Sequence, residues 1–297
     1  MIAALSFEQL LAQLSEQLAI LPDKPEETPD ATLRALWHAA AGQPKSPDLA
    51  QGMALPELGA EQYRTLRELI SRRLAGTPLA YLTERQRFLG LEMLAGPAAL
   101  IPRKETELLA GTAIHLLLGM EGSAPRVVDV CTGCGNVAIA IASRATHAHV
   151  YASDLSVEAV ALAQRNERYV GMGNRVDFRS GDLLTPFDFP EFHGTFDLIA
   201  CNPPYIATAN VERMPTEIAR HEPRLAFDGG PFGVSVLIRL LRDAPRFLRS
   251  SGWLVFEVGL GQGPSLLRML SKNADFARSQ GVNDAQDAVR VIAAQRR

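Results

Sequence analysis

The chain has 297 residues, of which 47% are hydrophobic and 21% are charged, which is enough apolar material for one large packed domain or two ordinary ones. Its formal net charge of −3 argues against a general nucleic-acid-coating protein, which needs a basic surface, so we expect no direct binding of nucleic acid. Its three cysteines are too few for a disulfide framework in a chain of this length.

The start of the chain predicts neither secretion nor membrane insertion. Its first residues, Met-Ile-Ala-Ala-Leu, lack a basic region and a cleavage site of the kind that signal peptides carry. Nowhere does the sequence contain an apolar run of the roughly 20 residues that a transmembrane helix needs. We therefore expect a cytoplasmic protein with no membrane contact.

Residues 1–76 are predicted to form a small helical domain. Ser6, with Gln9 three residues later, matches a capping box, and leucines follow at helical spacing. A second helix is expected from Asp30, whose side chain can cap it. A third helix is expected over residues 60–75. The apolar faces of these helices need one another, or the next domain, for burial.

Residues 77–102 are predicted to form a β-hairpin that links the helical domain to the rest of the chain. Two extended pieces are expected over residues 79–88 and 91–101. Leu89-Gly90 lies between them and favours a turn.

Residues 103–297 are predicted to form an α/β domain. After a helix from about Lys104 to Leu118, strands and helices alternate, which implies a doubly wound, mostly parallel sheet of seven strands. The last two strands are expected to form an antiparallel edge. The predicted strands cover residues 126–131, 148–153, 175–180, 196–201, 252–258, 276–281 and 288–294, and the later helices cover residues 136–145, 156–171, 233–249 and 262–273.

The first predicted strand runs into a glycine-bearing turn and then a helix. The turn has the pattern Asp129-x-Cys131-x-Gly133-x-Gly135. Glycines let the backbone approach a ligand closely, and a helix N-terminus offers free N–H groups. The pattern does not fit the Gly-x-Gly-x-x-Gly of dinucleotide sites and is similar to the S-adenosylmethionine loop of class I methyltransferases. We therefore predict S-adenosylmethionine as the cofactor, with Asp129 near its aminoacyl group or a bridging water.

Acidic residues after the next two strands extend this predicted cofactor site. Asp154 lies 19 residues after Gly135, the spacing at which an acidic side chain meets ribose hydroxyls. The Asp182 carboxylate can accept a hydrogen bond from the adenine amino group, and Leu183 can pack on the ring. An acidic strand end alone is more often a helix cap, but the order and spacing of these residues together favour a cofactor site.

The tetrapeptide Asn202-Pro203-Pro204-Tyr205 directly follows the fourth predicted strand. The prolines remove two backbone donors, Asn202 adds a side-chain carbonyl, and Tyr205 adds a flat aromatic face. A planar –NH2 group needs two acceptors and a surface to lie on. We therefore predict that these four residues bind an amide or exocyclic amine beside the cofactor. Asn202 and the Pro203 carbonyl would accept its hydrogens and Tyr205 would restrict its plane, making these three the candidate catalytic residues. A plain turn is the structural alternative.

Three cysteines lie near the same edge of the predicted sheet. Cys131 and Cys134 form a C-x-x-C pair, and Cys201 precedes the tetrapeptide. A redox pair or a zinc site is conceivable. No nearby Cys or His in the sequence supplies an obvious fourth ligand, so we favour small buried residues and expect no metal.

Several segments together resemble the release factor glutamine methyltransferases, the HemK/PrmC family, over nearly the whole chain. Ile101–Glu107 is similar to the family's Ile-Pro-Arg-Pro-Glu-Thr-Glu signature, and the helical N-terminus and hairpin fit the family as well. Further similar segments are Asn202–Tyr205, Glu222–Ala226 and Glu257–Gly259 with Gln262. The sequence departs from the family pattern at Lys104, Cys131, Phe232 and Val258.

The resemblance implies a reaction and a division of labour. Members of the family transfer a methyl group from S-adenosylmethionine to the side-chain amide of the Gly-Gly-Gln glutamine of peptide chain release factors. Residues 1–76 would recognise the protein substrate. By matching position, Asn202 and Pro203 would hold the glutamine amide, and Asp154 and Asp182 would hold the cofactor.

Other functions stay open on the sequence. The same tetrapeptide also serves methyltransferases that act on the adenine amino group of DNA or RNA, although the chain lacks a strongly basic segment for such a substrate. A divergent family member could methylate a small-molecule amide or amine. A degenerate cofactor-binding or ribosome-associated protein, in which Cys131 disrupts the cofactor loop, is a non-enzymatic alternative. Measuring S-adenosylmethionine binding distinguishes it from the others.

Overall fold

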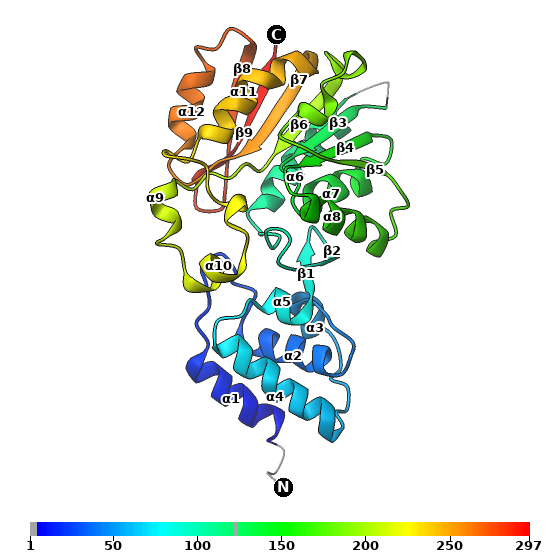
Figure 1. The fold of residues 1–297 in the computed structure, drawn as a ribbon, viewed down its shortest axis with the longest axis vertical. Helices are drawn as coiled ribbons and strands as arrows, with labels where there is room; N and C mark the ends of the chain where they lie inside the picture. The colour runs from blue at the N-terminus through cyan, green and yellow to red at the C-terminus, as the bar shows by residue number, and fades with distance from the viewer. Residues whose placement is uncertain (1–4, 121–123) are drawn as a thin grey trace.

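The computed structural model describes residues 5–120 and 124–297. An N-terminal helical part and a larger α/β part lie at opposite ends of an elongated molecule, with a two-stranded hairpin between them (Figure 1). None of the helices in these two stretches combines the length and hydrophobicity that a membrane span requires.

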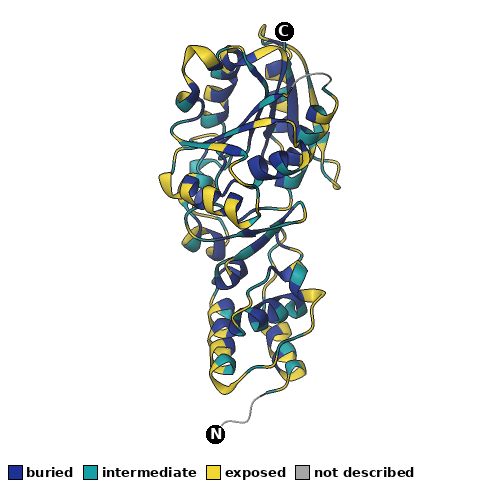
Figure 2. Ribbon diagram, turned by 90° about the vertical axis from the view of Figure 1, so that its right-hand side faces the viewer, coloured by how far each residue is buried: buried dark blue, intermediate teal, exposed yellow. Residues whose placement is uncertain are grey.

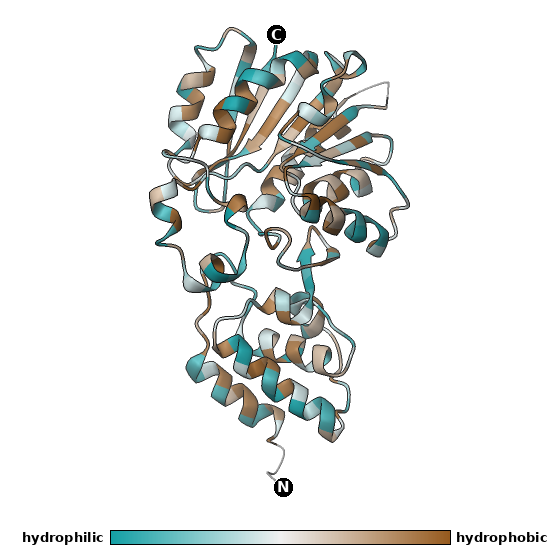
Figure 3. Ribbon diagram, viewed as in Figure 1, coloured by the Kyte–Doolittle hydropathy of each residue, from teal (hydrophilic) through white to brown (hydrophobic). Residues whose placement is uncertain are grey.

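The helical part is organised around leucines that the first, second and fourth helices bury against one another. Leu10, Leu14, Leu33, Leu36 and Leu66 are almost entirely inaccessible to solvent. Hydrophobic residues follow the inner faces of these helices and polar residues their outer faces (Figure 3). The helices are α1 (Phe7–Gln17), α2 (Pro29–Ala40), α3 (Pro47–Gln51), α4 (Ala60–Leu74) and α5 (Leu79–Thr83).

The caps of the first two helices test two sequence predictions. The capping box is confirmed, because Ser6 Oγ accepts from the N–H of Gln9 at 3.3 Å and Gln9 Oε1 accepts from the N–H of Ser6 at 2.9 Å. The prediction that Asp30 caps α2 is wrong. The helix begins earlier, with Thr28 as the N-cap residue. Pro29 occupies the first helical position, where its fixed φ suits the helix and its missing N–H is not needed.

The linking hairpin is shorter than predicted. Residues 79–83 form the helix α5 instead of a strand, since Leu79, Leu82 and Thr83 are all buried and their spacing fits one helical face. The strands β1 (Arg85–Phe88) and β2 (Leu91–Leu94) pair in antiparallel fashion. Leu89 and Gly90 have φ of 45° and 84°, as a tight two-residue hairpin turn requires.

The α/β part contains the predicted seven-stranded sheet, in the order β5-β4-β3-β6-β7-β9-β8. The first five of these are parallel, and β9 pairs antiparallel with both β7 and β8. The predicted fold class and the antiparallel edge are confirmed. The strands are β3 (Arg126–Val130), β4 (His149–Asp154), β5 (Val176–Ser180), β6 (Phe196–Cys201), β7 (Leu248–Glu257), β8 (Phe276–Asn283) and β9 (Val289–Arg296).

Helices cover both faces of the sheet, and a separate core fills each face. Residues of α6 and α7 pack on one face, and residues of α11 and α12 pack on the other. Figure 2 shows the buried residues concentrated in the strands and in the inner faces of these helices. The α-helices of the α/β part, including the two short helices α9 and α10 that lie between β6 and α11 in the chain, are α6 (Thr106–Leu118), α7 (Asn136–Arg144), α8 (Val157–Tyr169), α9 (Thr208–Val211), α10 (Thr216–His221), α11 (Ser235–Phe247) and α12 (Gly263–Leu270).

The strand order creates a switch point between β3 and β6. The chain proceeds outward from β3 to β4 and β5, then returns to β6 on the other side of β3. The loops that follow β3 and β6 therefore leave the sheet in opposite directions and open a crevice at its carboxyl edge, the usual ligand position in such sheets.

Candidate functional site

A cavity lies at this carboxyl edge and collects most of the residues that the sequence singled out. Loops after β3, β4, β5 and β6 contribute to it, together with residues that precede α6. Gly135, Pro203 and Tyr205 lie outside its lining. The predicted residues that do line it are Asp129, Cys131, Gly133, Asp154, Asp182, Leu183, Asn202 and Pro204.

The loop after β3 bends sharply around the floor of the cavity. Cys131, Gly133 and Gly135 have φ of 59°, 55° and 84°, a region that L side chains rarely adopt. Cys131 tolerates it at a cost of about 1–2 kcal/mol. Gly135 precedes α7 directly and is its N-cap residue. The loop therefore presents backbone groups to the cavity at the start of a helix.

Gly135 is required for packing as well as for conformation. A Cβ atom there would lie 2.9 Å from Ala163 Cβ on α8 and 3.1 Å from Ile139 Cδ1. We expect Gly135→Ala to lower the free energy of unfolding by about 3 kcal/mol, because backbone strain and overpacking add. Gly42 has a similar φ of 77° with no atom within 4 Å of an added Cβ. Gly42→Ala should therefore cost only about 1 kcal/mol. Urea unfolding of both variants checks this, and equal losses would contradict the packing role.

Asp129 is buried beneath the loop. Its Oδ2 accepts a hydrogen bond from Thr132 Oγ1 at 2.6 Å and one from the N–H of Ala138 at 3.2 Å. Among the described residues none donates a hydrogen bond to Oδ1. Burial raises the pKa of this carboxyl to about 7, although the two hydrogen bonds partly offset the effect. One oxygen of Asp129 therefore anchors the loop, and the other remains available to a ligand.

The raised pKa of Asp129 gives stability a distinct pH dependence. Between about pH 4 and pH 7 the folded chain holds a proton that the unfolded chain has released, so raising the pH favours unfolding. We expect this contribution to be a few kcal/mol at most, at about 1.4 kcal/mol per pKa unit. Asp129→Asn should abolish it. Urea titrations of both proteins at about pH 5 and about pH 7.5 check the prediction, which is refuted by the same pH effect in both.

Asp154, the last residue of β4, links the loop after β3 to the turn before α8. Its Oδ2 accepts from the N–H of Gly133 at 2.8 Å, and its Oδ1 accepts from the N–H of Ser156 at 2.9 Å. Burial raises the pKa of its carboxyl, against the lowering effect of these bonds. Asp154 thus closes the turn before α8 and lines the cavity. It is not the helix cap, because Ser156 is the N-cap residue of α8 and its Oγ accepts from the N–H of Ala159 at 3.1 Å.

The far end of the cavity carries one acidic group among apolar side chains. Asp182 is 42% exposed and forms an ion pair with Arg239 of α11. Leu183 adopts φ of 51°, and its carbonyl accepts a hydrogen bond from Ser153 Oγ at 2.7 Å. Leu155 and Val236 line the same region. This end therefore combines apolar side chains with the carboxylate of Asp182.

Asn202 faces the cavity and is held from behind. Its Nδ2 donates to Thr106 Oγ1 at 3.1 Å. Thr106 is the first residue of α6 and is itself buried. One N–H of the Asn202 amide is held by Thr106, and no described residue donates a hydrogen bond to its carbonyl oxygen, so that oxygen is available to a ligand.

The other residues of the tetrapeptide occupy different positions. Pro204 lines the cavity and Pro203 is buried outside its lining. Tyr205 turns away, and its hydroxyl donates to Glu257 Oε1 at 3.1 Å. The Tyr205 carbonyl accepts from Gln262 Nε2 at 3.1 Å. Glu257 and Gln262 thus hold Tyr205, while Thr106 holds Asn202.

The three cysteines show no arrangement for metal binding. Within residues 5–120 and 124–297, no group of three His, Cys, Asp or Glu side chains is placed to hold an ion. Cys134 and Cys201 are buried, and burial raises the pKa of both thiols. Protonated, enclosed thiols are poor nucleophiles and poor ligands.

Several cavity residues were not assigned a role from the sequence. Thr106 supports Asn202, and it belongs to a segment that carried only the family resemblance. The Pro223–Ala226 segment approaches from far along the chain, and no local pattern predicts that it lines this cavity. The unassigned lining residues on that side are Pro102, Arg103, Thr106, Pro223, Leu225, Ala226 and Arg239.

Comparisons with known proteins match both parts of the chain. Residues 9–83 match the PrmC N-terminal domain family, and residues 127–222 match a methyltransferase domain family. A release factor glutamine methyltransferase of Geobacter sulfurreducens is 38% identical over 72% of this chain and 72% of its own length. The enzyme of the same name from Streptomyces coelicolor is 37% identical over 74% of each chain.

Solved structures share the fold at low sequence identity. The human Mettl16 catalytic domain in complex with MAT2A 3′UTR hairpin 1 has a TM-score of 0.56 and 16% identity, covering 77% of this chain and 80% of that chain. Its complex with hairpin 6 has a TM-score of 0.53 and 15% identity, covering 76% and 81%. These likenesses support a methyltransferase-type doubly wound sheet.

Proposed function

Because this chain belongs to the release factor glutamine methyltransferase family, we propose that it methylates the side-chain amide nitrogen of the Gly-Gly-Gln glutamine of peptide chain release factors. The observation that carries the proposal is the meeting of Asn202 with the loop of Gly133 and Asp154 in one cavity. Residues 1–76 would recognise the release factor, and residues 103–297 would perform the methyl transfer. Residues 77–102 would link these two domains. We expect the protein to act in the cytoplasm, where release factors work.

S-adenosylmethionine is the proposed cofactor, and the cavity residues fit it. Asp129 Oδ1 has no donor among the described residues and would meet the cationic aminoacyl end. Asp154 would accept from the ribose hydroxyls. Asp182 would accept from the adenine amino group beside the apolar Leu183 and Leu155. The sulfonium of the bound cofactor supplies a methyl group that is intrinsically reactive towards nucleophiles.

The chain's own contribution is chiefly alignment of the acceptor. An amide nitrogen is a weak nucleophile because its lone pair is delocalised into the carbonyl. In the proposal, the carbonyl oxygens of Asn202 and Pro203 accept the two N–H hydrogens, which favours exposure of the lone pair and stabilises positive charge developing on nitrogen. The bond from Asn202 to Thr106 fixes which end of the Asn202 amide faces the acceptor. No strong base is needed, because the methylated product loses its proton readily.

Methyl transfer from radiolabelled S-adenosylmethionine tests the function directly. The acceptors are intact release factor, a release factor whose Gly-Gly-Gln glutamine is changed to alanine, and DNA or RNA. We expect label on intact release factor alone. Label on nucleic acid, or equal label on both release factors, would refute the proposed acceptor.

A further inference from the structure

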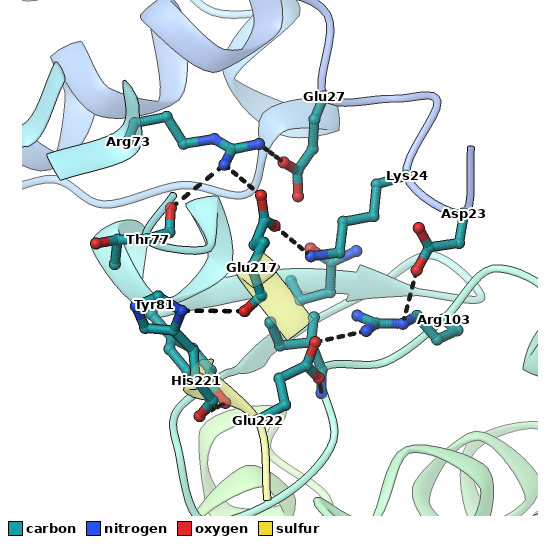
Figure 4. Close-up of polar contacts among 12 residues, drawn as sticks. Asp23, Lys24, Glu27, Arg73, Thr77, Tyr81, Arg103, Glu217, His221 and Glu222 are labelled. Atoms are coloured by element: carbon teal, nitrogen blue, oxygen red, sulfur yellow. Dashed lines mark hydrogen bonds and ion pairs between the residues drawn. The ribbon is translucent and has the colours of Figure 1, made fainter. Parts of the chain in front are cut away.

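A buried cluster of charged residues joins the helical part to α10, the short helix that follows the tetrapeptide (Figure 4). Glu217 of α10 accepts from Lys24 Nζ at 2.6 Å and from Arg73 Nη1 at 2.7 Å. Lys24 and Arg73 belong to the helical part, and both are 3% exposed. Both oxygens of Glu217 are therefore held by cations from the other end of the molecule.

The cluster is balanced in charge and closed to solvent. Arg73 Nη2 also donates to Glu27 Oε2 at 2.7 Å, so two cations face two carboxylates. Burial raises the pKa of Glu27 despite its cationic neighbours. Burial also tends to raise the pKa of Glu217, but Lys24 and Arg73 outweigh it and lower the pKa. Glu217 is thus held as a carboxylate by its two partners, which gives the contact a defined geometry.

A second set of ion pairs lies beside the Glu217 cluster, and we call the cluster and this second set the two ties (Figure 4). Arg103 Nη2 donates to Glu222 Oε1 at 2.5 Å, and Arg103 Nε is 3.2 Å from Asp23 Oδ2 in the helical part. The other oxygen of Glu222 accepts from the N–H of Ile101 at 2.9 Å. Arg103 therefore connects the helical part to the residue that ends α10.

Both ties end on the cavity. Arg103 lines it directly. Glu222 is followed at once by Pro223, and Pro223, Leu225 and Ala226 form one side of the lining; we term these three residues the 223–226 wall. Among the described residues, this is where contacts made by the helical part reach the cavity. Displacement of α10 would move the 223–226 wall with it.

We propose that Lys24 and Asp23 are positioning residues, through which the helical part holds the 223–226 wall in place and so sets the affinity of the cavity for its ligand. The helical part then has a role besides recognition of the protein substrate. The inference rests on the proposed function for the identity of that ligand, S-adenosylmethionine. Neither residue lines the cavity, so a direct contact with the ligand cannot explain an effect on binding.

Cofactor binding without release factor tests the inference. Binding of S-adenosylmethionine to the full chain is measured by titration calorimetry, at a temperature where circular dichroism shows each variant folded. Lys24→Met removes one cation and leaves Glu217 paired with Arg73, and Asp23→Asn weakens the second tie. We expect each to raise the Kd about fivefold to tenfold, the usual range of coupling between sites. Lys24→Arg keeps the charge and should restore the Kd of the unchanged chain.

A matched control separates coupling from general loss of stability. Arg34 forms an ion pair with Asp30 at 2.9 Å in the helical part, and Arg34→Met should leave the Kd unchanged. An unchanged Kd in both Lys24→Met and Asp23→Asn would overturn the inference while the proposed function stands. No binding by the unchanged chain would overturn the proposed function and the inference together. The kinetics of release-factor methylation are also measured for each variant. We expect Lys24→Met and Asp23→Asn to raise the KM for the cofactor.

Discussion

Asn202→Ala is expected to lower turnover by about 100-fold to 1,000-fold while changing cofactor affinity far less. Removing one preorganised polar group that acts on the reacting atoms costs about that factor in other enzymes. Here the lost group is the carbonyl oxygen of an amide that Thr106 holds in position from behind. Single-turnover methylation of release factor gives the rate, and titration calorimetry gives the affinity for S-adenosylmethionine.

Two further variants show whether the loss of turnover comes from the Asn202 carbonyl group. Thr106→Val keeps the Asn202 carbonyl but removes its support, so a smaller loss of about tenfold is expected for one hydrogen bond. Asn210→Ala makes the same substitution on the exposed α9 nearby and should have no effect. An equal loss of turnover and cofactor affinity in Asn202→Ala would contradict its assignment to the acceptor.

Asp154→Ala is expected to weaken cofactor binding by about 100-fold. Its carboxylate accepts the N–H groups of Gly133 and Ser156 and, in the proposal, the ribose hydroxyls. Hydrogen bonds to a charged group contribute about 1.5–3 kcal/mol each, and about 1.4 kcal/mol corresponds to a tenfold change in Kd. Loss of the carboxylate also frees the loop after β3, which adds to the cost of binding. The measurement is the Kd for S-adenosylmethionine.

The chemistry of the side chain predicts a graded series at this position. Asp154→Asn retains one acceptor oxygen and should fall between the unchanged chain and Asp154→Ala. Asp177→Ala, on the exposed face of β5 and paired with Arg179, is the matched control and should bind normally. A Kd for Asp154→Ala within about twofold of the unchanged chain would show that Asp154 only links the loops after β3 and β4 and does not bind the cofactor.

Local sequence patterns predicted the sheet and the loops around its carboxyl edge. The alternation of strand-like and helix-like segments predicted the order of the elements. The strands could be recognised because a strand that is buried on both faces is a short run of apolar residues. The glycines at 133 and 135 predicted a loop whose backbone approaches a ligand closely, and in the structure both have positive φ. Sequence patterns failed where the same spacing of apolar residues fits both a helix and a strand. The Leu79–Thr83 segment looked extended but is helical, since its burial against the other helices decided between the two.

The sequence by itself determined the family, the order of the elements and the motifs that meet at the switch point, because glycine conformation and hydrophobic periodicity are local properties. Only the tertiary structure decided how each side chain is used. It turned Tyr205 away from the cavity towards Glu257, and it occupied one oxygen of Asp129 with Thr132. It also brought Glu217 to Lys24 across 193 residues of chain. Such contacts depend on how whole domains pack together, so no spacing along the chain can predict them.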